Sequence, residues 1–188
     1  MQPPVVLLFF HLPGDIDTLG PLLESAEAVR GSLTVRAGAT PAFLAREGVA
    51  TFFGDLGATP LVIPDASPQS LQQIAGVKAI VTGSETTLKP HRAAHDLTLA
   101  LKAQGVRAYT VQHGFENVGL SYFDSIQGTE VRFAADTVFI WGTPDRFPPT
   151  IPDENRIKAR IAGRPQFQRR PAEPAWPGEP ATIDVAIF

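Results

Sequence analysis

Short runs of apolar residues alternate along this chain with segments of helical periodicity. The apolar runs cover residues 5–10, 33–36, 60–64, 79–81, 106–111 and 138–141. Most of them lead, through a turn, into a segment whose apolar residues recur at helical spacing. A strand that leads through a helix to the next strand pairs with it in parallel, by a right-handed crossover. The alternation therefore predicts an α/β fold with a doubly wound, mainly parallel, Rossmann-like sheet.

The expected helices lie between these strands, and their starts carry the usual signals. They cover residues 16–29, 41–56, 68–76, 90–104 and 153–161. Pro41 and Pro68 suit a first helical turn, and Gly105 suits the end of a helix. Residues 115–130 carry few apolar residues in any period, so we expect loop and irregular helix across the mouth of a cleft.

The composition changes after residue 167. Residues 168–182 are rich in proline, which is typical of a semi-rigid linker. Residues 183–188, IDVAIF, have the pattern of another buried strand. We therefore expect a Rossmann-like domain at 1–167, a linker at 168–182, and the first strand of a truncated second domain at 183–188. An edge strand of the same sheet and a disordered tail are the alternatives.

Composition and charge exclude several classes of protein. The chain has 188 residues, 44% of them apolar, which is enough for the core of one ordinary domain. Its 16 basic and 19 acidic residues give a net charge of −3 with no basic block, so nucleic acid is not an expected partner. Without cysteine there is no disulfide framework and no thiolate metal site. The N-terminal run VVLLFF is too short for a signal or spanning helix, and we expect a cytoplasmic protein.

Two common nucleotide-binding motifs are missing. The first strand is followed by HLPGDIDTLG, which lacks the G-x-G-x-x-G that brings a backbone against a pyrophosphate. The sequence also has no G-x-x-x-x-G-K-[ST]. We expect no dinucleotide or nucleoside triphosphate bound in the usual way, and no cofactor.

The stretch YTVQHG, residues 109–114, has an apolar body and a polar tip. Ligands of open α/β sheets bind outside the carboxyl ends of the strands, so Gln112, His113 and Gly114 are candidate site residues. Imidazole can hold or donate a proton near neutral pH. The alternative is a histidine that only caps the strand and bonds to nearby carbonyls.

Other strand ends offer further candidates. They are His11, Asp15 and Asp17 after the first strand, Ser84, Glu85 and Thr86 after the fourth, Glu116 after the fifth, and Gly142 after the sixth. Asp15 has the alternative role of capping the helix that begins at residue 16. His91 and His95 have the i, i+4 spacing of metal ligands, but no third ligand is evident, so we predict surface or cleft-lining residues and no metal.

The order of elements in the second half resembles a known family. A strand ending VQHG, a loop, a strand ending FIWG, a helix, and then GRPQF before a fresh strand are similar to the amino-terminal half of GT-B glycosyltransferases of bacterial capsule, teichoic-acid and surface-polysaccharide assembly. That group includes CDP-glycerol glycerophosphotransferase-like enzymes. The resemblance covers residues 106–188, while residues 5–81 match in architecture only. Gln168 stands where an acidic residue is usual.

The resemblance implies a two-domain enzyme that works in the interdomain cleft. A carboxy-terminal domain would hold most of the nucleotide-activated donor, and this chain would hold the glycan or polyol-phosphate acceptor. The 188 residues alone would then be inactive. The resemblance leaves open an association with the inner face of the cell membrane.

The resemblance also suggests roles for the candidate residues. His113, Glu116, His11 and Asp15 would be catalytic, with Glu116 orienting His113 or binding a sugar hydroxyl. Gln112, Gly114, Ser84, Glu85, Thr86 and Gly142 would bind substrate. Two other classes stay open: a nucleotide-sugar epimerase of the same architecture, and a binding or scaffold domain without chemistry.

Overall fold

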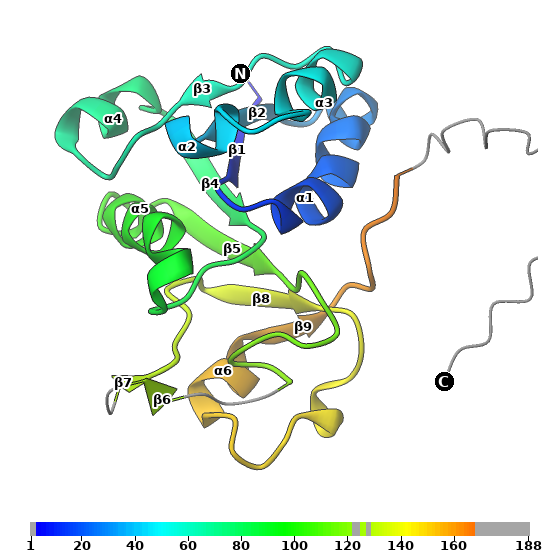
Figure 1. Ribbon diagram of the computed structural model, residues 1–188, viewed down its shortest axis with the longest axis vertical. Coiled ribbons are helices and arrows are strands. Elements are labelled where there is room, and N and C mark those ends of the chain that lie inside the picture. The colour runs from blue at the N-terminus through cyan, green and yellow to red at the C-terminus, as the bar shows by residue number, and fades with distance from the viewer. Residues whose placement is uncertain (1–2, 122–124, 127–128, 168–188) are drawn as a thin grey trace, which may run out of the picture.

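The computed structural model describes residues 3–121, 125–126 and 129–167. Seven strands form one sheet in the order β3-β2-β1-β4-β5-β8-β9, and all of its pairings are parallel (Figure 1). The strands are β1 Val5–Phe10, β2 Thr34–Ala39, β3 Leu61–Val62, β4 Val77–Thr82, β5 Arg107–Val111, β8 Thr137–Ile140 and β9 Ala159–Ile161. The predicted doubly wound α/β fold is confirmed.

Helices connect these strands on both faces of the sheet. They are α1 Gly14–Glu24, η1 Ser25–Val29, α2 Pro41–Leu44, α3 Val49–Asp55, α4 Pro68–Gln73, η2 Lys89–His91, α5 Arg92–Lys102, η3 Pro144–Arg146 and α6 Asp153–Lys158. The segment predicted as one helix over 41–56 is divided into α2 and α3. Gly48, at the start of α3, has a φ of 79°, a conformation that interrupts a right-handed helix and suits glycine.

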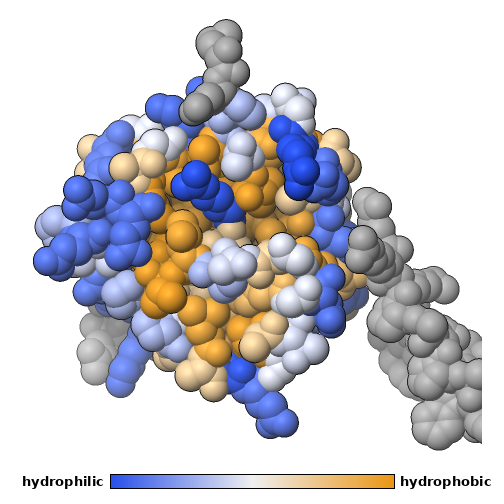
Figure 2. Space-filling view, turned by 90° about the horizontal axis from the view of Figure 1, so that it is seen from above, coloured by the Kyte–Doolittle hydropathy of each residue, from blue (hydrophilic) through white to orange (hydrophobic). Residues whose placement is uncertain are grey.

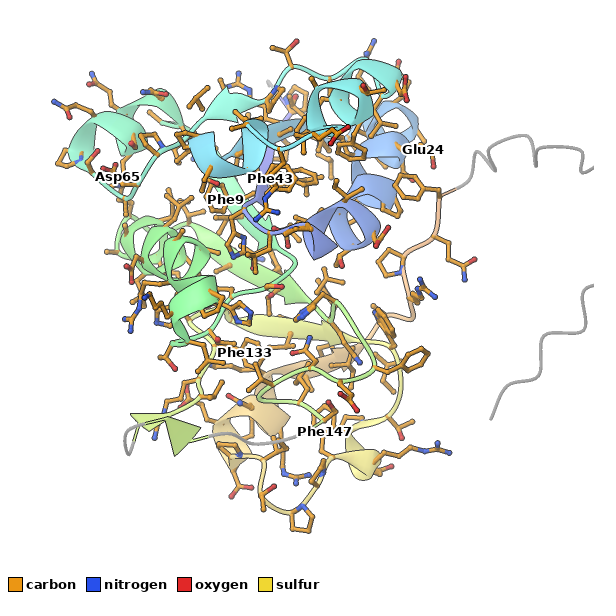
Figure 3. The ribbon with its side chains drawn as sticks, viewed as in Figure 1. Phe9, Glu24, Phe43, Asp65, Phe133 and Phe147 are labelled. Atoms are coloured by element: carbon orange, nitrogen blue, oxygen red, sulfur yellow. The ribbon has the colours of Figure 1, made fainter. Side chains whose placement is uncertain are left out.

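The central strand β1 is buried on both faces, and its side chains alternate between two cores. Leu7 and Phe9 pack with Leu97 of α5 on one face, while Leu8 and Phe10 pack with Leu19 of α1 on the other. Burying each such side chain contributes about 1.5–3 kcal/mol. Figure 3 shows Phe9 and Phe43 well apart from Phe133 and Phe147, which lie toward the β8 end of the sheet. A third, smaller core there contains Phe133, with Phe147 packed against it.

The edge strand β3 closes the sheet at the top of Figure 1. Seen from that side, apolar side chains gather in the middle of the surface and polar ones surround them (Figure 2). Val62 of β3 is 50% exposed. Because β3 has only two residues, this edge offers few backbone groups for pairing with another chain.

Two predictions about the second half need correction. Residues 153–161 were expected to be a single helix, but α6 ends at Lys158 and residues 159–161 form β9, parallel to β8. The edge of β8 offers backbone hydrogen bonds that a local helical pattern does not reveal. Residues 115–130 show turns and the short antiparallel pair β6 Ser125–Ile126 and β7 Thr129–Glu130, without a helix in their described part. The predicted linker at 168–182 and strand at 183–188 lie outside the described residues.

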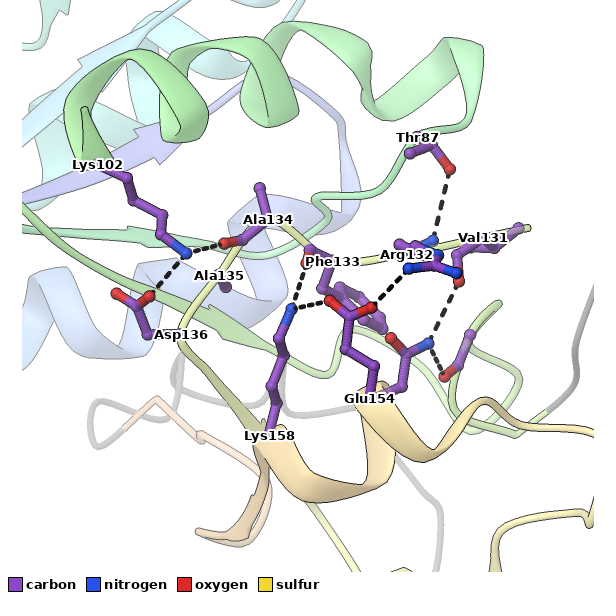
Figure 4. Close-up of polar contacts among 12 residues, drawn as sticks. Thr87, Lys102, Val131, Arg132, Phe133, Ala134, Ala135, Asp136, Glu154 and Lys158 are labelled. Carbon is purple, nitrogen blue, oxygen red and sulfur yellow. Dashed lines mark hydrogen bonds and ion pairs between the residues drawn. The ribbon is translucent and has the colours of Figure 1, made fainter. Parts of the chain in front are cut away.

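The segment that leads into β8, residues 131–136, is held from several sides (Figure 4). Lys102 of α5 donates to the Ala134 carbonyl at 2.6 Å and pairs with Asp136 at 2.7 Å. Lys158 of α6 donates to the Phe133 carbonyl at 2.7 Å. These contacts help to set the register of β8 against β5, and so the relative positions of the ends of the two strands.

The strand order places a topological switch point between β1 and β4. From β1 the chain runs outward to β2 and β3, and then returns to β4 and continues in the other direction. The crevice outside the carboxyl ends at such a point is the usual ligand site of an open α/β sheet. We therefore expect ligand-contacting residues in the segments that follow β1, β4 and β5.

Candidate active site

Three of the four histidines and one aspartate meet at the carboxyl edge of β1, β4 and β5. His11 follows β1, Asp15 lies in the first turn of α1, His91 ends η2, and His113 follows β5. The rings of His91 and His113 stand edge to face with centroids 6.0 Å apart. His11 and Asp15 both act electrostatically on His91 and on His113. We call His11, Asp15, His91 and His113 the histidine cluster.

Asp15 is fully buried, and one of its oxygens ties down the loop after β1. Its Oδ2 accepts the backbone N–H of His11 at 2.7 Å and that of Leu12 at 2.8 Å. The Nδ1 atom of His11 lies 3.0 Å from the same oxygen, at ion-pair distance but outside good hydrogen-bond alignment. The alternative reading of Asp15 as the N-cap of its helix is wrong: the carboxylate bonds to the residues before the helix and holds the His11 ring beside it.

Three polar atoms of this pair are buried without a hydrogen bond. They are Nδ1 and Nε2 of His11 and Oδ1 of Asp15, within the described part of the chain, and of these Nδ1 lies beside Oδ2 of Asp15. His11 is only 7% exposed. A buried unsatisfied polar group costs about 1–3 kcal/mol, and proteins keep few of them. At the switch point of a parallel sheet, such atoms are candidates for contact with a ligand.

Gly83 lets the loop after β4 come close to this pair. A Cβ atom added at Gly83 would lie 2.5 Å from Oδ1 of Asp15, closer than such atoms approach. Asp15 cannot easily move away, because it is buried and its other oxygen is held. Glycine at this position is therefore required by the close approach of the two loops.

His113 is oriented by Asn117 and not by Glu116. With the Asn117 amide oxygen facing the ring, it accepts from Nδ1 of His113 at 2.9 Å and from the His113 backbone N–H at 3.2 Å. Glu116 is exposed to solvent. Burial lowers the pKa of His113, while Asp15 and the Gly83 backbone oppose that shift and His11 adds to it. One ring nitrogen of His113 is thus held by a neighbouring side chain, but that neighbour is Asn117 and not the expected Glu116.

His91 and His95, four residues apart, face different partners. Nδ1 of His91 lies 2.7 Å from the Thr86 hydroxyl, inside the histidine cluster. Nδ1 of His95 lies 2.6 Å from Oε1 of Glu85, in a separate buried pair. No group of three or more His, Cys, Asp or Glu that could hold a metal ion occurs among the described residues. The predicted surface position is wrong for both side chains, since His91 is 9% exposed and His95 is 7% exposed.

Glu85 is an internal anchor in this structure. Its side chain is 0% exposed, and besides His95 it accepts the backbone N–H of Ala134 at 2.7 Å and that of Ala135 at 3.2 Å. The carboxylate thus ties the loop after β4 to the segment before β8. Both carboxylate oxygens are buried and already accept hydrogen bonds from the protein. The geometry therefore does not support the predicted substrate-binding role of Glu85.

The remaining candidates divide between the cluster and the neighbouring strand end. Ser84 and Thr86 are buried beside the cluster, at 3% and 1% exposure. Gln112 bridges β5 and β8: its Oε1 accepts the Trp141 backbone N–H at 2.9 Å and its Nε2 donates to the Gly114 carbonyl at 2.7 Å. Gly142 lies beyond Trp141, in a hollow beside the end of β8.

The cluster makes the stability of the fold depend on pH. Burial, and then the neighbouring His113 and His11, lower the pKa of His91 from 6.5 to about 4, against the opposing effect of Asp15. The unfolded chain, with the ordinary pKa, therefore binds the proton first as the pH falls. We expect full stability above about pH 6.5 and a progressive loss between pH 6.5 and 4.

Urea unfolding at pH 7.5, 6, 5 and 4.5 measures this loss. Glutamine in His91→Gln can still bond to Thr86 but does not titrate. The unfolding free energy of this variant should therefore fall less steeply with pH than that of the parent protein, and the two slopes should differ by up to about 1.4 kcal/mol per pH unit. An unchanged slope in that variant would mean that His91 is protonated equally in both states. The lowered pKa of His113 also makes stability fall as the pH falls, but it does so in the parent protein and in the variant alike.

Comparisons with known proteins add little to this description. No protein-family model and no curated protein sequence matches this chain. Among solved structures, the chain is similar to a protein described as a UDP-N-acetylglucosamine 2-epimerase from Listeria monocytogenes, with 14% identity and a TM-score of 0.45. The match covers 59% of this chain and 31% of that one, so this chain spans about a third of the length of the structure it matches. The fold assignment rests on the strand order and pairing described above.

None of the helices in the described part of the chain is long and apolar enough to cross a membrane.

Proposed function

We propose that this chain is the acceptor-binding half of a two-domain GT-B-type glycosyltransferase, or glycerophosphotransferase, of bacterial surface-polysaccharide synthesis. The observation that carries the proposal is the buried, unpartnered Nε2 of His11 beside Asp15, at the switch point of a parallel sheet. A nucleotide-activated donor is held mainly by a second domain, and a glycan or polyol-phosphate acceptor lies over the histidine cluster. Association with a membrane surface belongs to the same proposal.

His11 is the base in this proposal. Transfer requires that an acceptor hydroxyl lose its proton while its oxygen attacks the donor. Nε2 of His11 takes the proton, and Asp15 stabilises the imidazolium that forms, since its Oδ2 lies 3.0 Å from Nδ1. The acceptor oxygen forms the new bond to the anomeric carbon, or to phosphorus in a glycerophosphotransferase. The bond to the nucleotide phosphate breaks, and the nucleotide leaves with that electron pair.

The other residues of the cluster shape the acceptor site. His113 is fixed by Asn117 and His91 by Thr86, so both rings are preorganised around the position of the reacting hydroxyl. Because burial lowers the pKa of both rings, they are mainly neutral at pH 7. Glu116, exposed nearby, is available to a sugar hydroxyl at the rim.

A nucleotide-sugar 2-epimerase of the same architecture is the second candidate. Such an enzyme would use the same base to remove a proton from carbon, and it would need no acceptor. A binding domain without chemistry is the third possibility, and it would leave the unpartnered Nε2 of His11 without a use.

The assay that separates these candidates uses the protein expressed from its full reading frame. Nucleotide sugars and CDP-glycerol are offered with and without surface-polysaccharide fragments, and the products are followed by chromatography and mass spectrometry. We expect nucleotide release that depends on the acceptor. Epimerised nucleotide sugar without any acceptor would replace the transferase proposal with the epimerase. Unchanged donors and acceptors throughout would exclude both enzymes.

A further inference from the structure

The hollow beside the end of β8 lies at the same edge of the sheet as the histidine cluster. It has a volume of about 310 Å³ and lies at the carboxyl ends of β5 and β8. Its principal side chains are Phe115, Trp141, Thr143, Arg146 and Phe147. We call this hollow the aromatic groove. Gln112, which precedes His113 in the chain, also lines it and so connects the groove to the cluster.

Phe115 is the most exposed large apolar side chain in the described part of the molecule. It is 81% exposed and stands edge to face on Trp141, with ring centroids 5.3 Å apart. A phenylalanine left so open contributes little to the stability of the fold. Its position on a second aromatic ring, at the ligand-binding edge of the sheet, is typical of a platform for a ring-shaped ligand.

The polar groups around this platform are mainly donors and cations. Arg146 lines the groove, and the Arg164 guanidinium lies 5.3 Å from the centre of the Trp141 ring. The indole Nε1 of Trp141 is buried and has no acceptor among the described residues. Among the described residues that line the groove there is no aspartate or glutamate, and the Gln112 amide is already bonded to Trp141 and Gly114. The groove therefore matches a ligand that brings acceptors and negative charge.

We propose that the aromatic groove binds an acidic saccharide, with a sugar ring against Phe115 and Trp141 and its carboxylate held by Arg146. The C–H face of a pyranose packs on an aromatic ring, and its hydroxyls accept from N–H donors. Guanidinium groups bind carboxylates in a paired geometry. A nucleobase fits less well, because its amino groups would find few free acceptors. A pocket of this size holds one or two sugar units.

This inference rests on the proposed function, and it specifies the acceptor: an acidic glycan that runs from the groove to the histidine cluster. The cluster follows β1, β4 and β5 and the groove follows β5 and β8, so one short oligosaccharide can reach both. His11 acts on the terminal hydroxyl while the groove selects an acidic unit further along the glycan.

Binding to the full chain is measured by calorimetry and saturation-transfer NMR. The probes are tetrasaccharides that contain glucuronate or galacturonate, the neutral tetramer of N-acetylglucosamine, and uridine diphosphate. We expect at least one acidic probe to bind about tenfold more tightly than the neutral tetramer, and to weaken as salt increases. Phe115→Ala should weaken the acidic probe by about tenfold. Arg146→Gln should remove most of the preference for acid.

Matched controls keep the result specific. Ile157→Ala removes another exposed apolar side chain, 72% exposed on α6, and Arg46→Gln removes an exposed cation from the turn between α2 and α3. Neither should change binding. Melting temperatures of all four variants should stay close to that of the parent protein, because the changed side chains are exposed or half-buried.

Each other outcome overturns the proposal. Equal affinity for acidic and neutral probes, no binding of any acidic probe at millimolar concentration, or tighter binding of uridine diphosphate that Phe115→Ala weakens would each do so. The proposed function is tested separately by His11→Gln, which should keep saccharide binding and lose turnover. Saccharide binding without turnover in the parent protein would leave the groove standing and remove the transferase.

Discussion

Replacing His11 with glutamine is expected to lower the turnover of the full protein by about 10²–10⁴-fold, the usual effect of losing an acid–base group. Glutamine keeps most of the volume and can still accept or donate near Asp15, but it cannot take up a proton. His11 makes few contacts that the fold needs: its Nε2 is unpartnered, and its ring stacks on Phe9 at 5.9 Å. The melting temperature should therefore change little.

His95→Gln is the matched control, since it removes a histidine from a pair with Glu85 that faces the core. It should lower stability and leave turnover per folded molecule unchanged. Both quantities are measured on the same preparations, by thermal unfolding and by the transfer assay. If His11→Gln keeps normal turnover, or if its loss of turnover only follows a loss of folded protein, His11 is not the base.

Replacing Glu85 with alanine is expected to cost about 3–5 kcal/mol of unfolding free energy, the usual effect of removing one partner of a buried pair. The substitution leaves the N–H groups of Ala134 and Ala135 and the His95 ring without their acceptor. It also releases the loop after β4 from the segment before β8. A loss of this size is a large part of the stability of an ordinary domain.

Urea unfolding at pH 7.5 measures this loss. Glu47→Ala removes a carboxylate from an exposed turn and should change the unfolding free energy by less than about 0.5 kcal/mol. Glu85→Gln keeps one acceptor oxygen and should fall between the two. A loss below about 1 kcal/mol for Glu85→Ala would mean that water replaces the carboxylate and that residues 134–135 do not depend on it.

Local sequence patterns were sufficient for the elements whose environment repeats along the chain. The run VVLLFF predicts β1 correctly, because a strand covered on both faces needs a continuous apolar run. The order of strands and helices likewise predicts the parallel sheet and which strand ends share its carboxyl edge. His11, Asp15 and His113 could be selected for the same reason: each follows a strand whose carboxyl end opens at that edge.

Tertiary structure decided which of the polar residues at that edge share a site. His91 and His95 are four residues apart in one predicted helix, and the local sequence does not distinguish them. In the structure His91 lies beside Thr86 and His113, and His95 lies beside Glu85. The sequence could not show that the N–H groups of Ala134 and Ala135, about 50 residues away, require the Glu85 carboxylate. Residues 159–161 continue a helical pattern and yet form β9, because β8 presents an open edge there. In each case the partner comes from a distant segment, and the free energy of a buried hydrogen bond depends on that partner and not on the local pattern.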